Sequence, residues 1–272
     1  MSFSKLVVVA ALSTCLTGCL QSATLVRVKP DGSGTIEQTL LANLQTMKGM
    51  MATMGGGQMK DNAPGLMTEA DFKRTAERMG VKPVSLTPLK EGAFEGTKAI
   101  FAFDDITKVR VDQDPNLSGA PGAPAPASTS KSPIRFGFAK QGGNSVLTIT
   151  FDEKQADAAT AKVGAAAGSQ QATDAAMDPA IMQMVKTMFQ GFKVGVDLEV
   201  EGKIVKTNAD YVNGSRITLL EIELAGLFED EAKLKALQSK FGPGTTLTEI
   251  RPFLKDVKGV KINNPNLTIE YR

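Results

Sequence analysis

The dipeptide Asn213-Gly214 constrains the fold most strongly, because it lies between two segments in which apolar and polar residues alternate. Asn-Gly is typical of a two-residue β-hairpin turn, since both residues tolerate the positive φ angles that such a turn requires. We therefore expect residues 203–211 to pair with residues 216–224. Glycine-rich turns also separate two other pairs of alternating segments, which predict further hairpins: 23–29 with 35–41, and 134–139 with 145–151.

Helical signals lie between these hairpins. Thr68 is a capping residue before a segment that runs to Met79 and stops at Gly80, and Asp178-Pro179 opens an amphipathic segment to Phe192. Other segments read as helices (45–67, 229–240 and 247–257) or as strands (84–89, 94–103, 194–200 and 266–271). The resulting expectation is an α+β fold in which antiparallel sheets of hairpins pack with a few amphipathic helices.

Two low-complexity insertions interrupt this pattern. Residues 113–132 are rich in Pro, Gly, Ala and Ser, and residues 153–177 are rich in Ala, Gly, Gln and Asp. Such compositions bury little apolar surface, so we expect flexible segments within a single α+β domain over residues 23–272.

The N-terminal sequence has the order of a secretory signal: Lys5, then an apolar run, then Leu16-Thr17-Gly18-Cys19. The run is shorter than the roughly 20 apolar residues that span a bilayer. Leu-x-Gly-Cys resembles the bacterial lipoprotein lipobox, which implies removal of residues 1–18 and lipidation of Cys19. The alternative is an ordinary secretory signal in which Cys19 is incidental.

The lipobox resemblance implies a diacylglyceryl group on Cys19 and, in many Gram-negative bacteria, an amide-linked acyl chain such as palmitate. Leu20 follows the cysteine, where Asp would signal retention in the inner membrane, so the resemblance favours the periplasmic face of the outer membrane. Residues 19–22 would form the lipidated cysteine and a short tether. Because the tether is short, we expect the folded domain to act at or near the membrane.

Composition limits the available chemistry. The chain has no histidine and no tryptophan, and its two cysteines are Cys15, within the signal, and Cys19. Catalysis by Ser-His-Asp or Cys-His groups and histidine metal sites are therefore excluded, and we expect no enzyme activity and no cofactor beyond the lipid. A formal net charge of +2 without a basic cluster also argues against nucleic-acid binding.

The alternative to a protein without enzyme activity is a carboxylate-dependent envelope hydrolase. Its candidate catalytic residues are Asp104-Asp105 and Glu229-Asp230-Glu231.

Methionine is clustered at helical spacing. The residues concerned are Met47, Met50, Met51 and Met54 in one segment, and Met182, Met184 and Met188 in another. Methionine fills irregular cores, lines adaptable apolar grooves and, through its thioether, binds Cu(I). All three interpretations stay open: core filling, a groove for acyl chains or a partner helix, and a Cu(I) site.

Two hairpin segments resemble uncharacterised bacterial lipoproteins, including the LppM-like group. They are Pro30 to Thr35 and Gly202 to Ala209, the latter followed by Asn213-Gly214 and Ile217-Thr218-Leu219. The resemblance implies an envelope lipoprotein with an α+β domain that binds lipid or glycolipid, and it carries over no catalytic residue. We therefore expect a non-enzymatic, membrane-anchored lipoprotein that binds an apolar ligand or an envelope protein.

Overall fold

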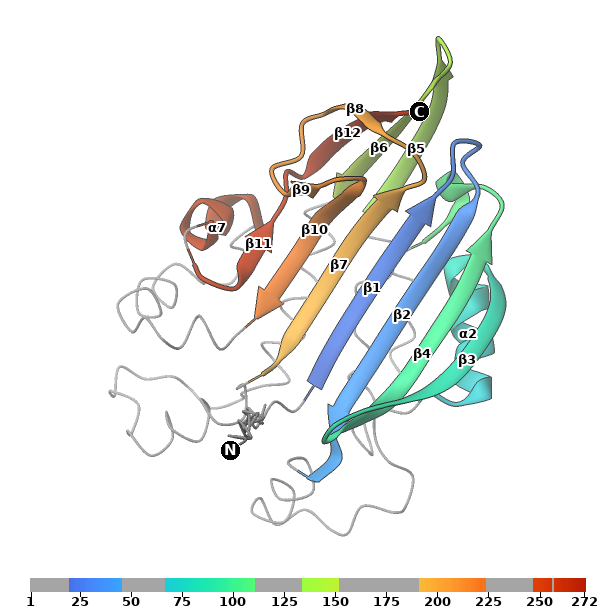
Figure 1. The fold of residues 1–272 in the computed structure, drawn as a ribbon, viewed down its shortest axis with the longest axis vertical. Helices are drawn as coiled ribbons and strands as arrows, with labels where there is room; N and C mark the ends of the chain where they lie inside the picture. The colour runs from blue at the N-terminus through green and yellow to red at the C-terminus, as the bar shows by residue number, and fades with distance from the viewer. Residues whose placement is uncertain (1–19, 46–66, 111–133, 152–190, 224–246, 256) are drawn as a thin grey trace, which may run out of the picture.

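The computed structural model describes residues 20–45, 67–110, 134–151, 191–223, 247–255 and 257–272. Within these ranges there are twelve strands, two α-helices and one 3-10 helix, so the described fold is mostly β (Figure 1). The expected α+β fold with a few amphipathic helices is wrong, because in the described residues a second sheet contributes more buried side chains to the core shared with the large sheet than α2 does. The insertions at 113–132 and 153–177, and the helices expected over 178–192 and 229–240, fall wholly or almost wholly outside the described residues.

The large sheet is mixed rather than antiparallel. Its strand order is β11-β10-β7-β1-β2-β4-β3, with β9 beside β10. The strands are β1 (Leu20–Val28), β2 (Gly34–Asn43), β3 (Lys82–Glu91), β4 (Phe94–Phe103), β7 (Lys193–Val200), β9 (Val212–Asn213), β10 (Arg216–Glu223) and β11 (Val260–Ile262). β1 and β7 run parallel at the centre, although their first residues, Leu20 and Lys193, are 173 positions apart in the sequence, and no local pattern indicates that pairing.

A second sheet covers one face of the large sheet, at the end opposite the start of β1 (Figure 1). Its order is β5-β6-β12-β8, with β5 (Ile134–Gln141), β6 (Asn144–Phe151), β8 (Ile204–Thr207) and β12 (Asn266–Tyr271). The two sheets share one core. In the large sheet, a fully buried row crosses five neighbouring strands: Ile217, Leu198, Val26, Ile36 and Phe101. Leu147, Ile149, Leu267 and Ile269 join the same core from the second sheet.

The hairpin expected around Asn213-Gly214 forms only over β9, which pairs two residues with β10. Residues Ile204–Thr207 pair instead with β12 in the second sheet, so the expected pairing of 203–211 with 216–224 is wrong over most of its length. The loop itself consists of Gly214 and Ser215, and only Gly214 has a positive φ, of 63°. This is the type II′ arrangement, with glycine at the first central position.

The other two hairpins are confirmed. In the β1–β2 turn, Asp31 Oδ1 accepts hydrogen bonds from the Ser33 backbone N–H (2.9 Å) and hydroxyl (2.7 Å), and these bonds lower the pKa of Asp31. The β5–β6 turn uses Gly142 and Gly143, both with positive φ. β1 begins at Leu20, three residues before the expected start at residue 23.

The expected helix after Thr68 is confirmed as α2 (Glu69–Met79). A capping box joins Thr68 and Asp71, and Gly80 ends the helix in the left-handed conformation. Its buried face includes Phe72, whose ring lies 4.9 Å from that of Phe101 in β4, centroid to centroid. The second helix, α7 (Leu247–Leu254), contains Pro252, and the 3-10 helix η1 spans Ile106–Lys108.

Candidate functional site

The part of the fold nearest to Cys19 is the edge of the large sheet at which β1 begins, here called the N-terminal edge. Leu20 is paired with Ala42 near the end of β2, and Gln21 has Lys193, the first residue of β7, as its register partner. Lys193 is in turn paired with Glu223 at the end of β10. Starts and ends of four central strands therefore meet at this edge (Figure 1).

The predicted site residues all lie outside the described residues: Cys19, Met47, Met50, Met51, Met54, Met184 and Met188. Their points of attachment are described, however. Cys19 is bonded to Leu20, the first methionine segment follows β2, and the second precedes β7. Because these three strand ends are neighbours in the sheet, the chain leaves the fold toward the lipidation position and both methionine segments from the N-terminal edge.

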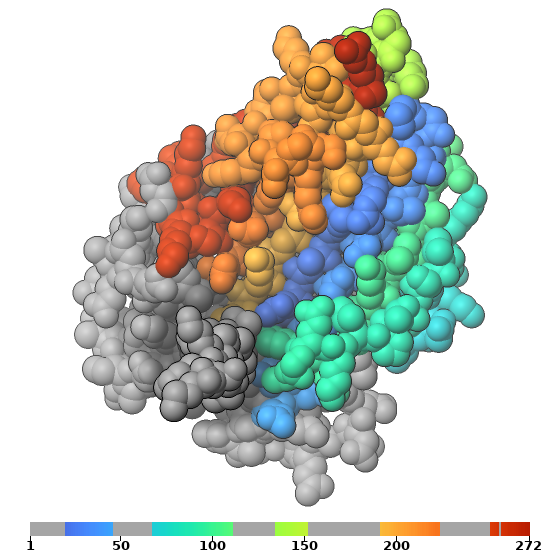
Figure 2. Space-filling view, viewed as in Figure 1, coloured from blue at the N-terminus to red at the C-terminus, as the bar shows by residue number. Residues whose placement is uncertain are grey.

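The large sheet carries a charged face on the side away from the core. Arg27 lies between Glu37 (3.3 Å) and Glu199 (3.5 Å), and Lys98 Nζ lies 2.7 Å from Glu37. Arg216 pairs with Asp197 at 3.1 Å on the same face. Figure 2 shows the large sheet from this side, which is the side away from α2. Each of these carboxylates has a cationic partner, which suits a solvated surface better than proton transfer.

Burial and hydrogen bonding act in opposite directions on Glu37. Partial burial raises its pKa, but hydrogen bonds from Lys98 and Arg27 outweigh that effect, so the net pKa is lowered from its ordinary value. Glu37 is thus held as an anion between two cations, at the centre of the charged face.

The candidate carboxylates for a hydrolase make local contacts where they are described. Asp104 pairs with Lys82 at 2.6 Å, and both side chains are more than two-thirds exposed. Asp105 caps η1 by accepting hydrogen bonds from the hydroxyl and backbone N–H of Thr107, which lower its pKa. Glu229, Asp230 and Glu231 lie outside the described ranges. In the described part of the chain, no three acidic, histidine or cysteine side chains gather in a group that could hold a metal ion.

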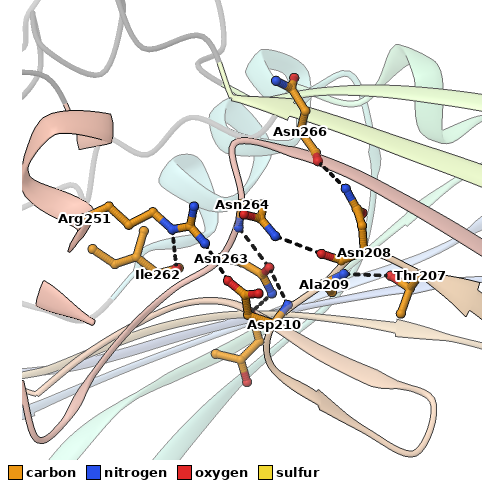
Figure 3. A network of polar contacts seen from close by, with 10 residues as sticks. Thr207, Asn208, Ala209, Asp210, Arg251, Ile262, Asn263, Asn264 and Asn266 are labelled. Carbon is orange, nitrogen blue, oxygen red and sulfur yellow. Dashed lines mark hydrogen bonds and ion pairs between the residues drawn. The ribbon is translucent and has the colours of Figure 1, made fainter. Parts of the chain in front are cut away.

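An asparagine network joins the two sheets, and its members were not expected from the sequence (Figure 3). Asn263, which is 3% exposed, donates to the Thr218 carbonyl (2.9 Å) and accepts from the backbone N–H groups of Asp210 (3.0 Å) and Asn264 (2.9 Å). Its side chain thereby satisfies three backbone groups where β11 leads into β12. The asparagine-rich run Asn263-Asn264-Pro265-Asn266 is the sequence feature that could have indicated this network.

A second asparagine extends this network to β8. Asn208 donates to the Asn266 carbonyl (2.9 Å) and accepts from the Thr268 backbone N–H (2.8 Å). Arg251 on α7 also reaches the network, through its contacts with Asp210 and with the Ile262 carbonyl. Because the side chains of Asn208 and Asn263 are occupied by backbone partners, the network is a structural joint that directs residues 204–207 into the second sheet.

No protein-family model and no curated protein matches the sequence. Among solved structures, the chain is similar to the folded domain of the Mycobacterium tuberculosis LppM protein, with 10% identity and a TM-score of 0.35 over 94% of this chain and 90% of the other. Among the described helices, none has the length and apolar character needed to cross a bilayer.

Proposed function

We propose that this protein is a non-enzymatic lipoprotein of the bacterial envelope, anchored through acyl chains on Cys19. The observation that carries the proposal is the lipobox-like Leu16-Thr17-Gly18-Cys19 directly before Leu20, the first residue of β1. Two acyl chains suffice for stable anchoring, since each buried methylene contributes about 0.8 kcal/mol. Leu20, in place of Asp, favours the periplasmic face of the outer membrane.

The anchor leaves almost no tether. The expected spacer of residues 20–22 belongs to β1, so a single peptide bond joins the acylated residue to the sheet. One extended residue reaches at most about 3.6 Å. The folded domain is therefore held at the bilayer surface, where its ligands or partners must also be found.

We further propose that the protein binds a lipid or another apolar ligand beside its anchor. The attachment of both methionine segments to the N-terminal edge supports this, because the same edge carries the anchor and methionine is a side chain that adapts to varied apolar ligands. The contacts of Asp104 and Asp105 give no support to a hydrolase. The Cu(I) alternative stays a prediction.

Acylation is tested by metabolic labelling with an alkyne-tagged fatty acid. The wild-type protein should take up the label and fractionate with membranes, and Cys19→Ser should abolish both. Cys15→Ser is the matched control, since it removes the only other thiol of the sequence and should leave labelling intact. Labelling of Cys19→Ser, or none of the wild type, would contradict the proposal.

Ligand binding is tested by lipid extraction and mass spectrometry of the purified full chain. The double variant Met184→Lys/Met188→Lys should co-purify with several-fold less lipid than the wild type. Val205→Lys is the control, because Val205 is 50% exposed on β8 in the second sheet. Equal lipid content in all three proteins would rule out the second methionine segment, which carries Met184 and Met188, as the binding element.

A further inference from the structure

We infer that the large sheet stands upright on the membrane, with its N-terminal edge against the lipid headgroups and its opposite end directed away from the bilayer. This inference rests on the proposed acylation of Cys19. It goes further by naming the surface that meets the lipid and the surface that is left for other partners.

The two faces of the large sheet are unsuited to contact with hydrocarbon. One carries the ion pairs of Arg27, Glu37 and Glu199, and moving these charges from water into hydrocarbon is strongly unfavourable. The other is covered in part by the second sheet and α2, which bury Phe101 and Ile36. An orientation in which the large sheet lies flat on the bilayer, with either face down, is therefore disfavoured. Contact with the bilayer is left to one of the two ends of the sheet, at which its strands begin or finish.

The direction of β1 shows that the N-terminal edge is the end that faces the membrane. Leu20 is one bond from the acylated residue, and Val28, eight residues on, lies at the far end of the strand. At about 3.3 Å per residue, the strand carries the chain roughly 26 Å away from its anchor. β7 runs parallel to β1 and ends beside it, with Val200 paired to Val28, so both central strands point away from the membrane.

The turns at the far end are polar and exposed, as expected for a surface in water. They contain Lys29 and Asp31 after β1, and Glu201 and Lys203 after β7. The Glu201 backbone N–H donates to the Val28 carbonyl at 2.8 Å, which holds the two turns together. We call this group of turns the distal end; in Figure 1 it lies at the end of the sheet toward which the arrows of β1 and β7 point.

Single-cysteine labelling can measure this orientation, because the mature chain would have no free thiol once Cys19 is acylated. Ala93→Cys places an environment-sensitive fluorophore in the exposed β3–β4 turn, next to Phe94, which pairs with Asn43 at the N-terminal edge. Lys203→Cys places the same fluorophore at the exposed distal end. Both acylated variants are reconstituted in phosphatidylethanolamine–phosphatidylglycerol vesicles that contain brominated lipid.

The expected result is quenching at position 93 at least threefold stronger than at position 203. Equal quenching at both positions, or stronger quenching at position 203, would overturn the upright orientation. Intact mass measured on the same preparations separates this failure from that of the proposed function. Missing acyl mass would overturn both, whereas acylated protein with the wrong quenching pattern would overturn the orientation alone.

Discussion

The hydroxyl of Tyr271 donates a hydrogen bond of 2.8 Å to the carbonyl oxygen of Lys29, and so fastens the last strand of the second sheet to the first hairpin of the large sheet. The tyrosine side chain is buried in the common core. Beside it, the hydroxyl of Ser145 donates to the Pro30 carbonyl, also at 2.8 Å. The β1–β2 turn is thus held by two side chains of the second sheet.

Burial of Tyr271 should be visible in its titration. Burial, followed by the nearby charge of Asp31, raises the pKa of Tyr271 to about 12. Because the chain has two tyrosines and no tryptophan, Tyr211→Phe leaves Tyr271 as the only phenol, and its ionisation can be followed by ultraviolet absorbance. Because this folded-state pKa lies above the unfolded value of about 10, the neutral phenol of Tyr271 contributes to the stability of the folded protein. That contribution is complete below about pH 10 and is lost as the pH rises toward about 12. Ionisation near pH 10 in the folded protein would contradict the burial.

Removal of the Tyr271 hydroxyl should destabilise the protein. Tyr271→Phe leaves the Lys29 carbonyl without this donor, and the free energy of unfolding in urea should fall by about 1–2 kcal/mol. Tyr211→Phe is the matched control and should change it by less than about 0.5 kcal/mol. Equal effects of the two substitutions would show that the hydrogen bond contributes nothing specific.

Asn263 should be among the least replaceable polar residues. Asn263→Ala removes one donor and one shared acceptor from three backbone partners, and we expect a loss of about 2–4 kcal/mol in unfolding free energy. Asn266→Ala serves as the comparison, because the structural contact of Asn266 comes from its backbone carbonyl and its side chain is exposed. If Asn263→Ala unfolds at the same urea concentration as Asn266→Ala, the joint between the sheets does not depend on this side chain.

The ion pairs of Glu37 should stabilise the folded protein at neutral pH and should lose this effect in acid. Since the folded-state pKa of Glu37 is lowered from 4.5, its contribution is present above that pH and is lost as the pH falls through the folded-state value. Glu37→Gln should therefore reduce stability at neutral pH by about 1 kcal/mol and should match the wild type near about pH 2. Glu91→Gln, at the exposed end of β3, is the control and should change the free energy of unfolding at neutral pH by less than about 0.5 kcal/mol. A Glu37→Gln effect that persists at low pH would point to lost packing instead.

Two strand glycines should respond oppositely to alanine. A Cβ at Gly96 would lie 1.8 Å from the Leu40 carbonyl oxygen, so Gly96→Ala must displace β2 and should cost more than about 2 kcal/mol. A Cβ at Gly195 would meet nothing within 4 Å, and Gly195→Ala should be neutral or slightly stabilising. Thermal unfolding of the two variants compares them directly, and similar melting temperatures would contradict the close approach of β2 and β4.

Local signals in the sequence located most of the described elements. The Thr68 cap, the Gly142-Gly143 turn and the β12 strand at residues 266–271 follow from capping chemistry, positive-φ glycines and alternation, which act over a few residues. These signals say where an element lies, but they do not say which strand it pairs with.

The partners of β7 and β8 could not be derived for that reason. The alternation of Val194 to Val200 fits any sheet position, whereas its pairing with β1 depends on burying Leu198 beside Val26. Ile204–Thr207 likewise fits either sheet, and Asn208 directs it to β12 through its bonds with backbone groups. The candidate lipidation site followed from the sequence alone, but its closeness to the fold required the observed start of β1 at Leu20.

The most direct test of membrane anchoring is the mass of the N-terminal peptide from membrane-purified protein. If the protein is a lipoprotein, this peptide begins at Cys19, lacks residues 1–18 and carries the added mass of a diacylglyceryl group on the cysteine sulfur. A mature chain that begins at any other residue, or an unmodified Cys19, would contradict the central claim.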